Sequence, residues 1–234
     1  MRIAASPGAL VVELGAEHRC LSSAVLGGGL GRMRSWLDLG VPGDYARLDP
    51  EAHLLEASAG LPEPVVGMLT AVDVTRYRSA RSGGARAVAT VGATHALAAA
   101  GRRPRTVPSL GTINVLVVVE APLTDAGLAG AFLTAVEAKA QALADARVPA
   151  RNAAGWATGT ATDSVCVACP PGASEPFAGP ATQTGAALAR AVHAAVLAGA
   201  LAEREEERAP APPARAAGPP EEASALVGRA RCSP

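Results

Sequence analysis

Short apolar runs bounded by glycine and proline fill the first two thirds of this chain. Runs of this length and composition are typical of β-strands rather than helices. Gly15-Ala16-Glu17 separates the first two runs with the spacing of a hairpin turn, so two strands are expected there. The chain must therefore fold around a sheet. The expected strands are 9–14, 19–26, 65–74, 86–91, 112–120 and 164–168.

Three helices are expected at 50–59, 125–147 and 183–201. The longest has Thr124 as its N-cap and Asp125 in its first turn, both of which stabilise a helix start. Strands interrupted by helices through short connections predict an α+β fold. We expect a mixed, largely antiparallel sheet sandwiched by the long helix, the C-terminal helix and the short helix.

The composition changes near residue 202, and this change sets the expected domain boundary. The segment 203–234 is rich in proline, alanine, glutamate and arginine. It has too few apolar groups to offset the entropy lost on ordering. We expect one folded domain over residues 1–202 and a disordered tail over residues 203–234.

The composition also excludes some classes of partner. Aromatic residues make up 3% of the chain, whereas base-stacking nucleic-acid modules need aromatic platforms. The 21 basic and 21 acidic residues cancel, so no net charge draws the protein to a nucleic acid or an anionic membrane. Four scattered cysteines, and the lack of a signal peptide or an uncharged apolar span, predict a cytoplasmic protein.

Lys139 is the only lysine of the chain and lies within the long helical segment. At 100° per residue, Leu128, Phe132, Val136 and Leu143 form one apolar stripe, and Lys139 falls in its middle. Its ammonium must then face the interior or a cleft, where an unpaired charge is costly. Either its stem packs while its head reaches water or a carboxylate, or it binds negative charge at a site.

The densest polar cluster is the run from Gly155 to Ser164. If the run is extended, Thr158, Thr160, Thr162 and Ser164 share one face, and Asp163 points to the other. Hydroxyls beside a carboxylate can position a water or supply a nucleophile with its base. The alternative is a threonine-rich lead into a strand, with Asp163 capping a turn.

Three other features give weaker signals. Ser22 and Ser23 lie in the expected strand 19–26, which leads into a glycine-rich turn that contains Gly28. This turn either forms a flexible wall around a bulky ligand or is a plain glycine turn. Cys166 and Cys169 lack the second pair of cysteines or histidines that a four-ligand zinc site needs, so no metal site is expected. We expect both to be small apolar residues of the core. His95 follows an apolar run, and strand ends often carry sites.

Taken together and in order, seven segments resemble the adenosylcobinamide amidohydrolase (CbiZ-type) family of cobamide salvage. The resemblance extends from about residue 20 to about residue 195. Its most specific parts are Gly-Thr-Ile-Asn at 111–114, Glu137-Ala-Lys139 and the threonine run ending at Asp163. The segments are 21–29, 41–50, 65–74, 88–96, 111–143, 155–165 and 177–192.

The resemblance implies hydrolysis of the amide that joins a corrin propionyl side chain to aminopropanol, releasing adenosylcobyric acid. Amide hydrolysis needs an attacking oxygen, an oxyanion stabiliser and a proton for the leaving amine. We expect Asp163 as base or orienting group, Thr160 or Thr162 as nucleophile or water-positioning group, and Lys139 as oxyanion stabiliser or proton donor. The corrinoid is the substrate, and no cofactor or metal is required.

The expected substrate-binding residues include Asn114, because a corrin rim carries carboxamides that an asparagine can bind. A homo-oligomer is compatible with the sequence, and the small corrinoid is the expected partner. The full expected set of substrate-binding residues is Asn114, Thr112, Ser22, Ser23, Gly28, Thr158, His95 and Glu137.

Some positions depart from the pattern of the family. Phe177, Ala181 and Ala186 stand where the family usually has tyrosine, histidine and glutamate, and Thr94-His95 stands where it has Ser-Asn. Two alternatives therefore stay open: a non-catalytic corrinoid-binding protein of the same fold, and an amidohydrolase of another bulky amide.

Overall fold

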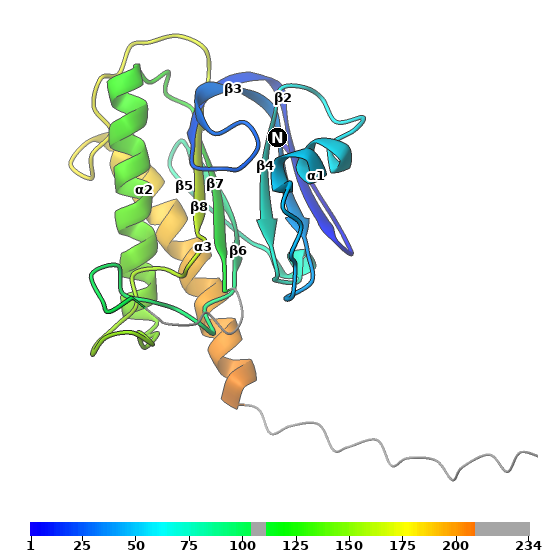
Figure 1. Cartoon of the computed structure of the whole chain (residues 1–234). Coiled ribbons are helices and arrows are strands. Elements are labelled where there is room, and N and C mark those ends of the chain that lie inside the picture. The colour runs from blue at the N-terminus through cyan, green and yellow to red at the C-terminus, as the bar shows by residue number, and fades with distance from the viewer. Residues whose placement is uncertain (104–110, 209–234) are drawn as a thin grey trace, which may run out of the picture.

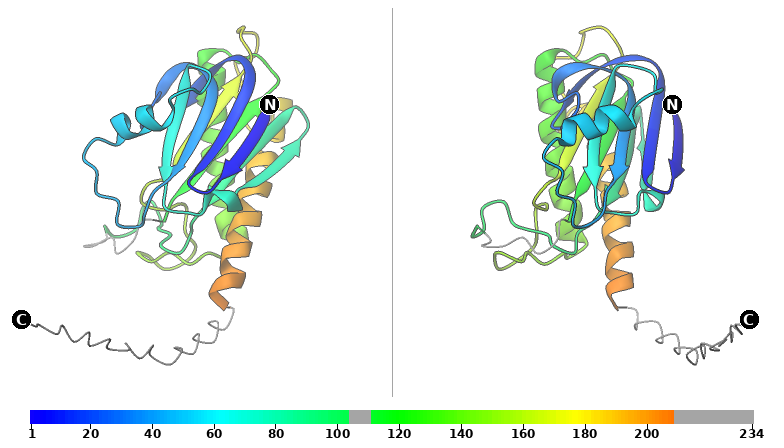
Figure 2. Two further views of the ribbon diagram at one scale, coloured as in Figure 1. Left: turned by 90° about the vertical axis from the view of Figure 1, so that its right-hand side faces the viewer. Right: turned by 45° about the vertical axis from the view of Figure 1, so that its right-hand side comes forward.

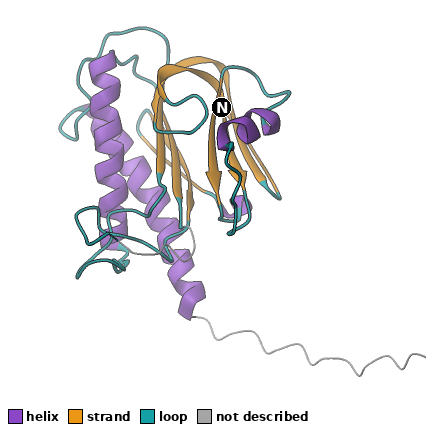
Figure 3. Cartoon of the chain, viewed as in Figure 1, coloured by secondary structure: helices purple, strands orange, loops and turns teal. Residues whose placement is uncertain are grey.

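The computed structural model describes residues 1–103 and 111–208, which form one eight-stranded sheet with three α-helices (Figures 1 and 3). The sheet order is β4-β3-β2-β8-β7-β6-β5, and β1 pairs with β2 outside this path. The strands are β1 (Arg2–Ser6), β2 (Ala9–Ser22), β3 (Gly29–Gly40), β4 (Val65–Thr70), β5 (Arg78–Ser82), β6 (Ala85–Val91), β7 (Ile113–Val119) and β8 (Ser164–Cys169). The helices are α1 (Pro50–Ala57), α2 (Asp125–Asp145) and α3 (Gln183–Arg208), and a 3-10 turn η1 spans Val74–Arg76.

The sheet is mixed and mostly antiparallel, as expected. Only the pairs β3–β4 and β7–β8 are parallel among the described strands. The start of α2 is also as expected, because the Thr124 side chain accepts a hydrogen bond of 3.1 Å from the backbone N–H of Gly127. This contact replaces one of the hydrogen bonds that a helix start lacks.

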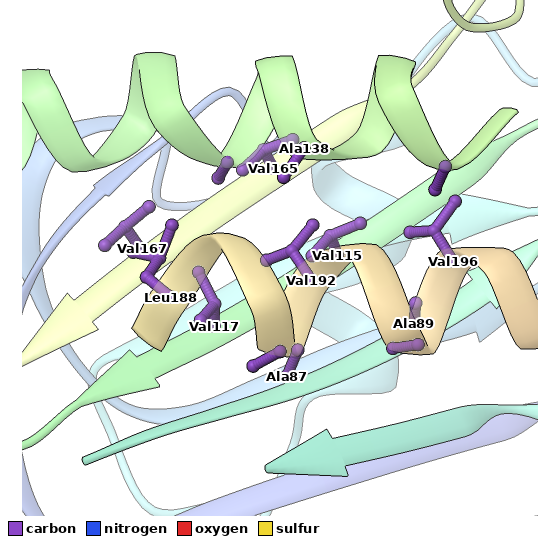
Figure 4. Packing of buried hydrophobic residues seen from close by; sticks show 14 of the residues in the cluster. Ala87, Ala89, Val115, Val117, Ala138, Val165, Val167, Leu188, Val192 and Val196 are labelled. Atoms are coloured by element: carbon purple, nitrogen blue, oxygen red, sulfur yellow. The ribbon is translucent and has the colours of Figure 1, made fainter. Parts of the chain in front are cut away.

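Helices α2 and α3 cover one face of β6, β7 and β8 (Figure 4). Side chains alternate along a strand, so every second residue of β7 points toward the helices. Val115 and Val117 are fully buried there, against Ala135 of α2 and Val192 of α3. The small alanines let the helices approach the sheet closely.

The N-terminal strands lie across the other face of the same sheet (Figure 2). Leu116 of β7 and Cys166 of β8 point away from the helices and pack with Trp36 and Met33 of β3. The sheet therefore curls over itself, and the molecule has two cores, one on each face of β7 and β8. Cys166 and Cys169 are both buried, on opposite faces of β8, which confirms the prediction that they fill the core.

Strand β2 is continuous, so the predicted hairpin at Gly15–Glu17 is wrong. Both halves of β2 pair with β3, and the register shifts between Glu13 and His18. Gly15, with φ of +80°, supplies the left-handed conformation that such a bulge uses. The bulge, rather than a turn, interrupts the apolar pattern. Strands β1, β3 and β5 are not among the predicted elements, because each alternates few large apolar residues with charged or small ones.

Helix α3 extends to Arg208, six residues beyond the predicted boundary at 202. The Glu203 carboxylate accepts a hydrogen bond of 2.7 Å from the Thr94 hydroxyl, and Glu206 pairs with Arg76. These contacts hold a charged helical end against the domain. The rest of the predicted tail, 209–234, lies outside the described residues. By length and composition α3 could cross a membrane, but its apolar side packs against α2 and the sheet.

Candidate active site

Polar side chains gather where β7 and β8 begin and β6 ends. Asn114 of β7 lies in register with Ser164 of β8 and with Thr90 of β6. Asn114 precedes Leu116 on the face turned away from the helices, so these three side chains point toward the N-terminal strands. Farther along this face of the three strands the buried side chains are apolar, among them Val88, Leu116 and Cys166.

Lys139 and Asp163 form a buried ion pair beside this edge. The Lys139 residue is 5% exposed, which confirms that the lysine faces inward from α2. The Asp163 carboxylate also accepts hydrogen bonds from the backbone N–H of Ile113 (3.0 Å), the backbone N–H of Thr160 (3.1 Å) and the Thr160 hydroxyl. Four donors replace the water that the buried carboxylate gives up. Asp163 thus ties α2, the start of β7 and the loop before β8 together.

Gly159 makes this close approach possible. A β-carbon at this position would lie 2.4 Å from Asp163 Oδ2 and 2.6 Å from Lys139 Nζ. Real β-carbons do not come so near to other heavy atoms, so any larger residue must displace the ion pair. The glycine of the threonine-rich run is therefore required by the ion pair itself.

Two pockets open on either side of the segment 160–164. The larger, with a volume of about 620 Å³, is lined by Lys139, Thr158, Thr160 and Asp163 together with the loop 97–103. The smaller, of about 180 Å³, is lined by Thr112, Asn114, Thr162 and Ser164 and by residues of β4 and the loop after β3. Typical small-molecule sites have volumes of about 300–1,000 Å³, a range that only the larger pocket reaches.

The segment before β8 is not extended, so the predicted common face of Thr158, Thr160, Thr162 and Ser164 is wrong. The chain turns between Thr160 and Asp163, because the Asp163 carboxylate binds back to Thr160. As a result Thr160 lines the large pocket and Thr162 lines the small one. The Thr162 hydroxyl lies 2.8 Å from the Thr112 hydroxyl.

Seven of the twelve predicted site residues line one of the two pockets, and five line neither. Ser22 and Ser23 bind the backbone of β8 through Val165, and so fasten β2 to β8. A β-carbon on Gly28 would lie 2.3 Å from the carbonyl oxygen of Ala24, so this glycine serves the turn. Glu137 is exposed on α2 and lines neither pocket.

His95 lies in the loop that follows β6, close to the large pocket but outside its lining. The loop is held by the Asn152 side chain, whose oxygen accepts a hydrogen bond from the backbone N–H of Ala98 (2.8 Å) and whose N–H group donates to the backbone carbonyl oxygen of Ala98 (3.0 Å). Asn152 also lines the large pocket. Asn152 is not among the predicted site residues, since nothing near it in the sequence marks it as the partner of a loop some 50 residues earlier.

Asp38 of β3 is a second residue that the sequence analysis missed. It is fully buried and accepts hydrogen bonds from the Asn114 side-chain N–H (2.7 Å) and the Thr90 hydroxyl (2.6 Å). Burial raises the pKa of Asp38 to about 6, and these two hydrogen bonds limit that rise. Charged residues are rarely buried without a partner, and Asp38 has no cationic partner among the described residues.

Of the positions that depart from the family pattern, Thr94 and His95 lie in the loop after β6, and Phe177, Ala181 and Ala186 line neither of the two pockets. Phe177 is exposed, and the neighbouring residues Glu175, Gln183 and Thr184 line a third pocket with Glu120 at the far end of β7. A strand of seven residues spans roughly 20 Å, so this region is separated from Asn114 by the length of β7. Within the described residues, no cluster of three or more acidic, histidine or cysteine side chains could hold a metal ion.

Comparison with known proteins agrees with the resemblance in the sequence. Residues 1–208 match the family described as adenosylcobinamide amidohydrolase (CbiZ). The chain is 33% identical over 201 residues to the adenosylcobinamide amidohydrolase of Halobacterium salinarum, an alignment that covers 80% of this chain and 82% of the relative. An uncharacterised protein of Methanocaldococcus jannaschii is 33% identical over 89 residues, which are 38% of this chain and 35% of that protein. The chain therefore belongs to the adenosylcobinamide amidohydrolase family.

Proposed function

We propose that this protein hydrolyses the amide of adenosylcobinamide, releasing adenosylcobyric acid and aminopropanol for cobamide salvage in the cytoplasm. Family membership supports the substrate. One structural observation supports the chemistry. A hydroxyl, a carboxylate and an ammonium are hydrogen bonded in series, Thr160 to Asp163 to Lys139, in the wall of an open pocket.

The attacking oxygen in this proposal is the Thr160 hydroxyl or a water that it holds. A nucleophile within hydrogen-bonding distance of a base is the usual arrangement for activating a weak oxygen nucleophile. Thr160 donates its hydroxyl hydrogen to Asp163, which leaves the oxygen lone pairs free to attack or to orient a water. Asp163 takes the proton as the new carbon–oxygen bond forms.

Lys139 stabilises the negative charge that develops on the carbonyl oxygen. One of its three N–H groups binds Asp163, and no other partner lies within hydrogen-bonding distance among the described residues. The remaining N–H groups can bind the oxyanion, where a fixed charge in a partly dry site is strongly stabilising. When the carbon–nitrogen bond breaks, the leaving nitrogen takes the proton held by Asp163 or one from Lys139. If a water attacked, a carboxylate now remains on the corrin. If Thr160 attacked, the corrin acyl group stays on Thr160 as an ester, and a water that gives its proton to Asp163 then hydrolyses the ester to the corrin carboxylate and restores the Thr160 hydroxyl.

Asp163 also orients the other two groups. Its four hydrogen bonds fix both carboxylate oxygens, and this arrangement favours the orienting role together with a short proton transfer from Thr160. The small residues Ala98, Ala99 and Gly101 also line the large pocket. They leave room for the edge of a bulky ring next to Lys139.

The test is incubation of the purified protein with adenosylcobinamide, followed by chromatography for adenosylcobyric acid. We expect turnover by the wild type, and at least a 100-fold lower kcat for Thr160→Val and Asp163→Asn. Thr75 and Asp73 form a similar exposed hydroxyl–carboxylate pair with a distance of 2.7 Å, so Thr75→Val and Asp73→Asn are matched controls that should retain full activity. Tight corrinoid binding without product would refute hydrolysis and leave a corrinoid-binding protein.

A further inference from the structure

In the side-chain amide of Asn114, the N–H group is hydrogen bonded and the carbonyl oxygen is not. Its Nδ2 group donates to Asp38 Oδ1 (2.7 Å) and to the carbonyl oxygen of Leu69 (2.9 Å). Both partners accept hydrogen bonds, so the amide has only one orientation that satisfies them. The other atom, Oδ1, is buried without a hydrogen-bond donor among the described residues.

Asp38 is what fixes this orientation. The carboxylate sits on β3, opposite Asn114, and its other oxygen accepts from Thr90. An ionised carboxylate accepts hydrogen bonds and donates none. It therefore holds the Asn114 N–H group toward Asp38 and leaves Asn114 Oδ1 pointing away from Asp38. Asp38 makes no contact with either pocket and acts through Asn114, as a positioning residue.

Asn114 lines the small pocket, whose walls are otherwise apolar or carry hydroxyls. A buried acceptor without a donor is costly, and the cost disappears when a ligand supplies the donor. The volume of about 180 Å³ corresponds to roughly six water molecules at ~30 Å³ each, enough for a short aliphatic group but not for a corrin ring. The lining residues are Val25, Val41, Pro42, Tyr45, Met68, Leu69, Thr70, Ala71, Thr112, Asn114, Thr162 and Ser164.

We propose that the small pocket binds a short aliphatic group that carries a hydroxyl, and that Asn114 Oδ1 accepts the hydrogen bond of that hydroxyl. Given the proposed function, on which this step rests, the group is the aminopropanol end of the substrate. The corrin then lies in the large pocket. A carboxylate is excluded from the small pocket, because it offers no hydrogen to Asn114 and is repelled by Asp38.

The position of Asp163 fits this division of the substrate. Its two neighbours in the chain, Thr162 and Ser164, line the small pocket, while Asp163 itself lines the large one. If one substituent of the amide lies in each pocket, the amide group itself lies over the segment 162–164, between the pockets. The reacting carbon then lies beside the Thr160–Asp163–Lys139 series.

Two neutral amides of nearly equal shape test the proposal. N-(2-hydroxypropyl)acetamide carries the hydroxyl, and N-(2-methylpropyl)acetamide has a methyl group in its place. Titration of the full chain followed by NMR should give at least tenfold tighter binding of the hydroxyl compound, because a site built to bind a hydroxyl rejects an analogue without one. In Asn114→Leu the two affinities should differ by less than twofold. Gln141 carries an exposed side-chain amide on α2 and lines neither pocket, so Gln141→Leu is the matched control, which should keep the tenfold preference.

Equal affinities in the wild type would overturn the proposal, as would a preference that survives in Asn114→Leu. If that variant does not fold, the side-chain N–H resonances of Asn114 in the wild type give the answer. They should shift with the hydroxyl compound and not with the methyl compound, and the reverse or no difference would overturn the proposal.

Turnover of adenosylcobinamide separates this proposal from the proposed function. Hydroxyl preference without turnover would support the pocket assignment and refute hydrolysis. Turnover without hydroxyl preference would support hydrolysis and overturn the pocket assignment. Asp38→Asn adds a further readout: it weakens the fixed orientation of Asn114, so it should raise the KM for adenosylcobinamide several-fold with little change in kcat, whereas a purely structural role would lower the amount of active protein and leave KM unchanged.

Discussion

Two buried polar clusters flank the start of β7 and β8, and they differ in how completely their hydrogen bonds are met. The Asp163 cluster, made of Lys139, Thr160 and Asp163, gives the carboxylate four donors. The Asp38 cluster, made of Asp38, Thr90 and Asn114, leaves the carbonyl oxygen of Asn114 without a donor. Both lie beside a pocket.

This difference in hydrogen bonding indicates that the two clusters of buried polar side chains have different roles. A cluster in which every carboxylate lone pair is occupied holds elements together and keeps reactive groups in fixed positions. A cluster that leaves one buried acceptor unbound carries a cost that a ligand can remove. The Asp163 cluster thus positions the proposed chemistry, and the Asp38 cluster prepares a binding surface.

The largest expected effect comes from breaking the ion pair of the Asp163 cluster. Lys139→Met removes the cation and leaves a buried carboxylate, which should cost about 3–5 kcal/mol in the free energy of unfolding. Urea titration measures the loss. Lys139→Arg keeps the charge and should lose less. A loss below about 1 kcal/mol for Lys139→Met would mean that the cluster does not hold the fold together.

The pH dependence of stability distinguishes the Asp38 cluster. The folded pKa of Asp38, about 6, lies above its ordinary value of 3.8, so the folded state holds the proton more tightly between these values. The stabilisation from this group is therefore fully present below about pH 3.8, is lost as the pH rises from there through about 6, and does not change at higher pH. A shift of about two pKa units corresponds to on the order of 3 kcal/mol.

Asp38→Asn isolates that contribution. We subtract the free energy of unfolding of the wild type from that of the variant. This difference should be about 3 kcal/mol more positive at pH 7.5 than at pH 4. Groups with lowered pKa values, such as Asp49, remain in both proteins and cancel in the difference. Urea titrations at the two pH values provide the measurement, and a difference that does not change with pH would contradict the assignment.

A smaller effect is expected from crowding the ion pair. Gly159→Ala places a β-carbon on Asp163 and Lys139, so it should destabilise the fold by about 1–3 kcal/mol and lower kcat. Gly130→Ala, in α2, is the control. The nearest atom to its new β-carbon is 3.7 Å away, and alanine favours a helix over glycine by about 0.5–1 kcal/mol. Thermal unfolding should move in opposite directions for the two variants, and an unchanged melting temperature for Gly159→Ala would refute the crowding argument.

The smallest expected effect is that of Thr90→Val, which removes one of the two donors to Asp38. It should cost about 1–2 kcal/mol at pH 7.5, where Asp38 is ionised, and less at pH 4. The pH at which stability falls should move upward, because the carboxylate has lost a stabilising hydrogen bond. Equal losses at both pH values would show that the hydroxyl does not serve the carboxylate.

The parts of the fold that follow from local patterns could be predicted from the sequence. The N-cap at Thr124, the inward-facing Lys139 and the apolar strands β6, β7 and β8 each depend on neighbouring residues alone. The continuous β2 was not predicted, because a bulge at Gly15 looks like a turn when the partner strand is unknown. The extension of α3 to Arg208 depends on Thr94 and Arg76, which are distant in the chain.

The same limit applies to the site. The Thr160–Asp163 contact is local, and the sequence analysis singled out both residues. Asp38 could not be found, since its partner Asn114 lies 76 residues later and β3 has no clear strand pattern. A lone aspartate in such a segment is indistinguishable from a surface residue until the sheet curls and brings β3 over β7.

The most direct test of this account is a structure of the protein with N-(2-hydroxypropyl)acetamide bound. The account predicts that the hydroxyl oxygen lies about 2.7–3.0 Å from Asn114 Oδ1 in the small pocket, with the amide beside Asp163 and Lys139. A ligand bound wholly in the large pocket, with Asn114 Oδ1 contacting only water, would contradict it.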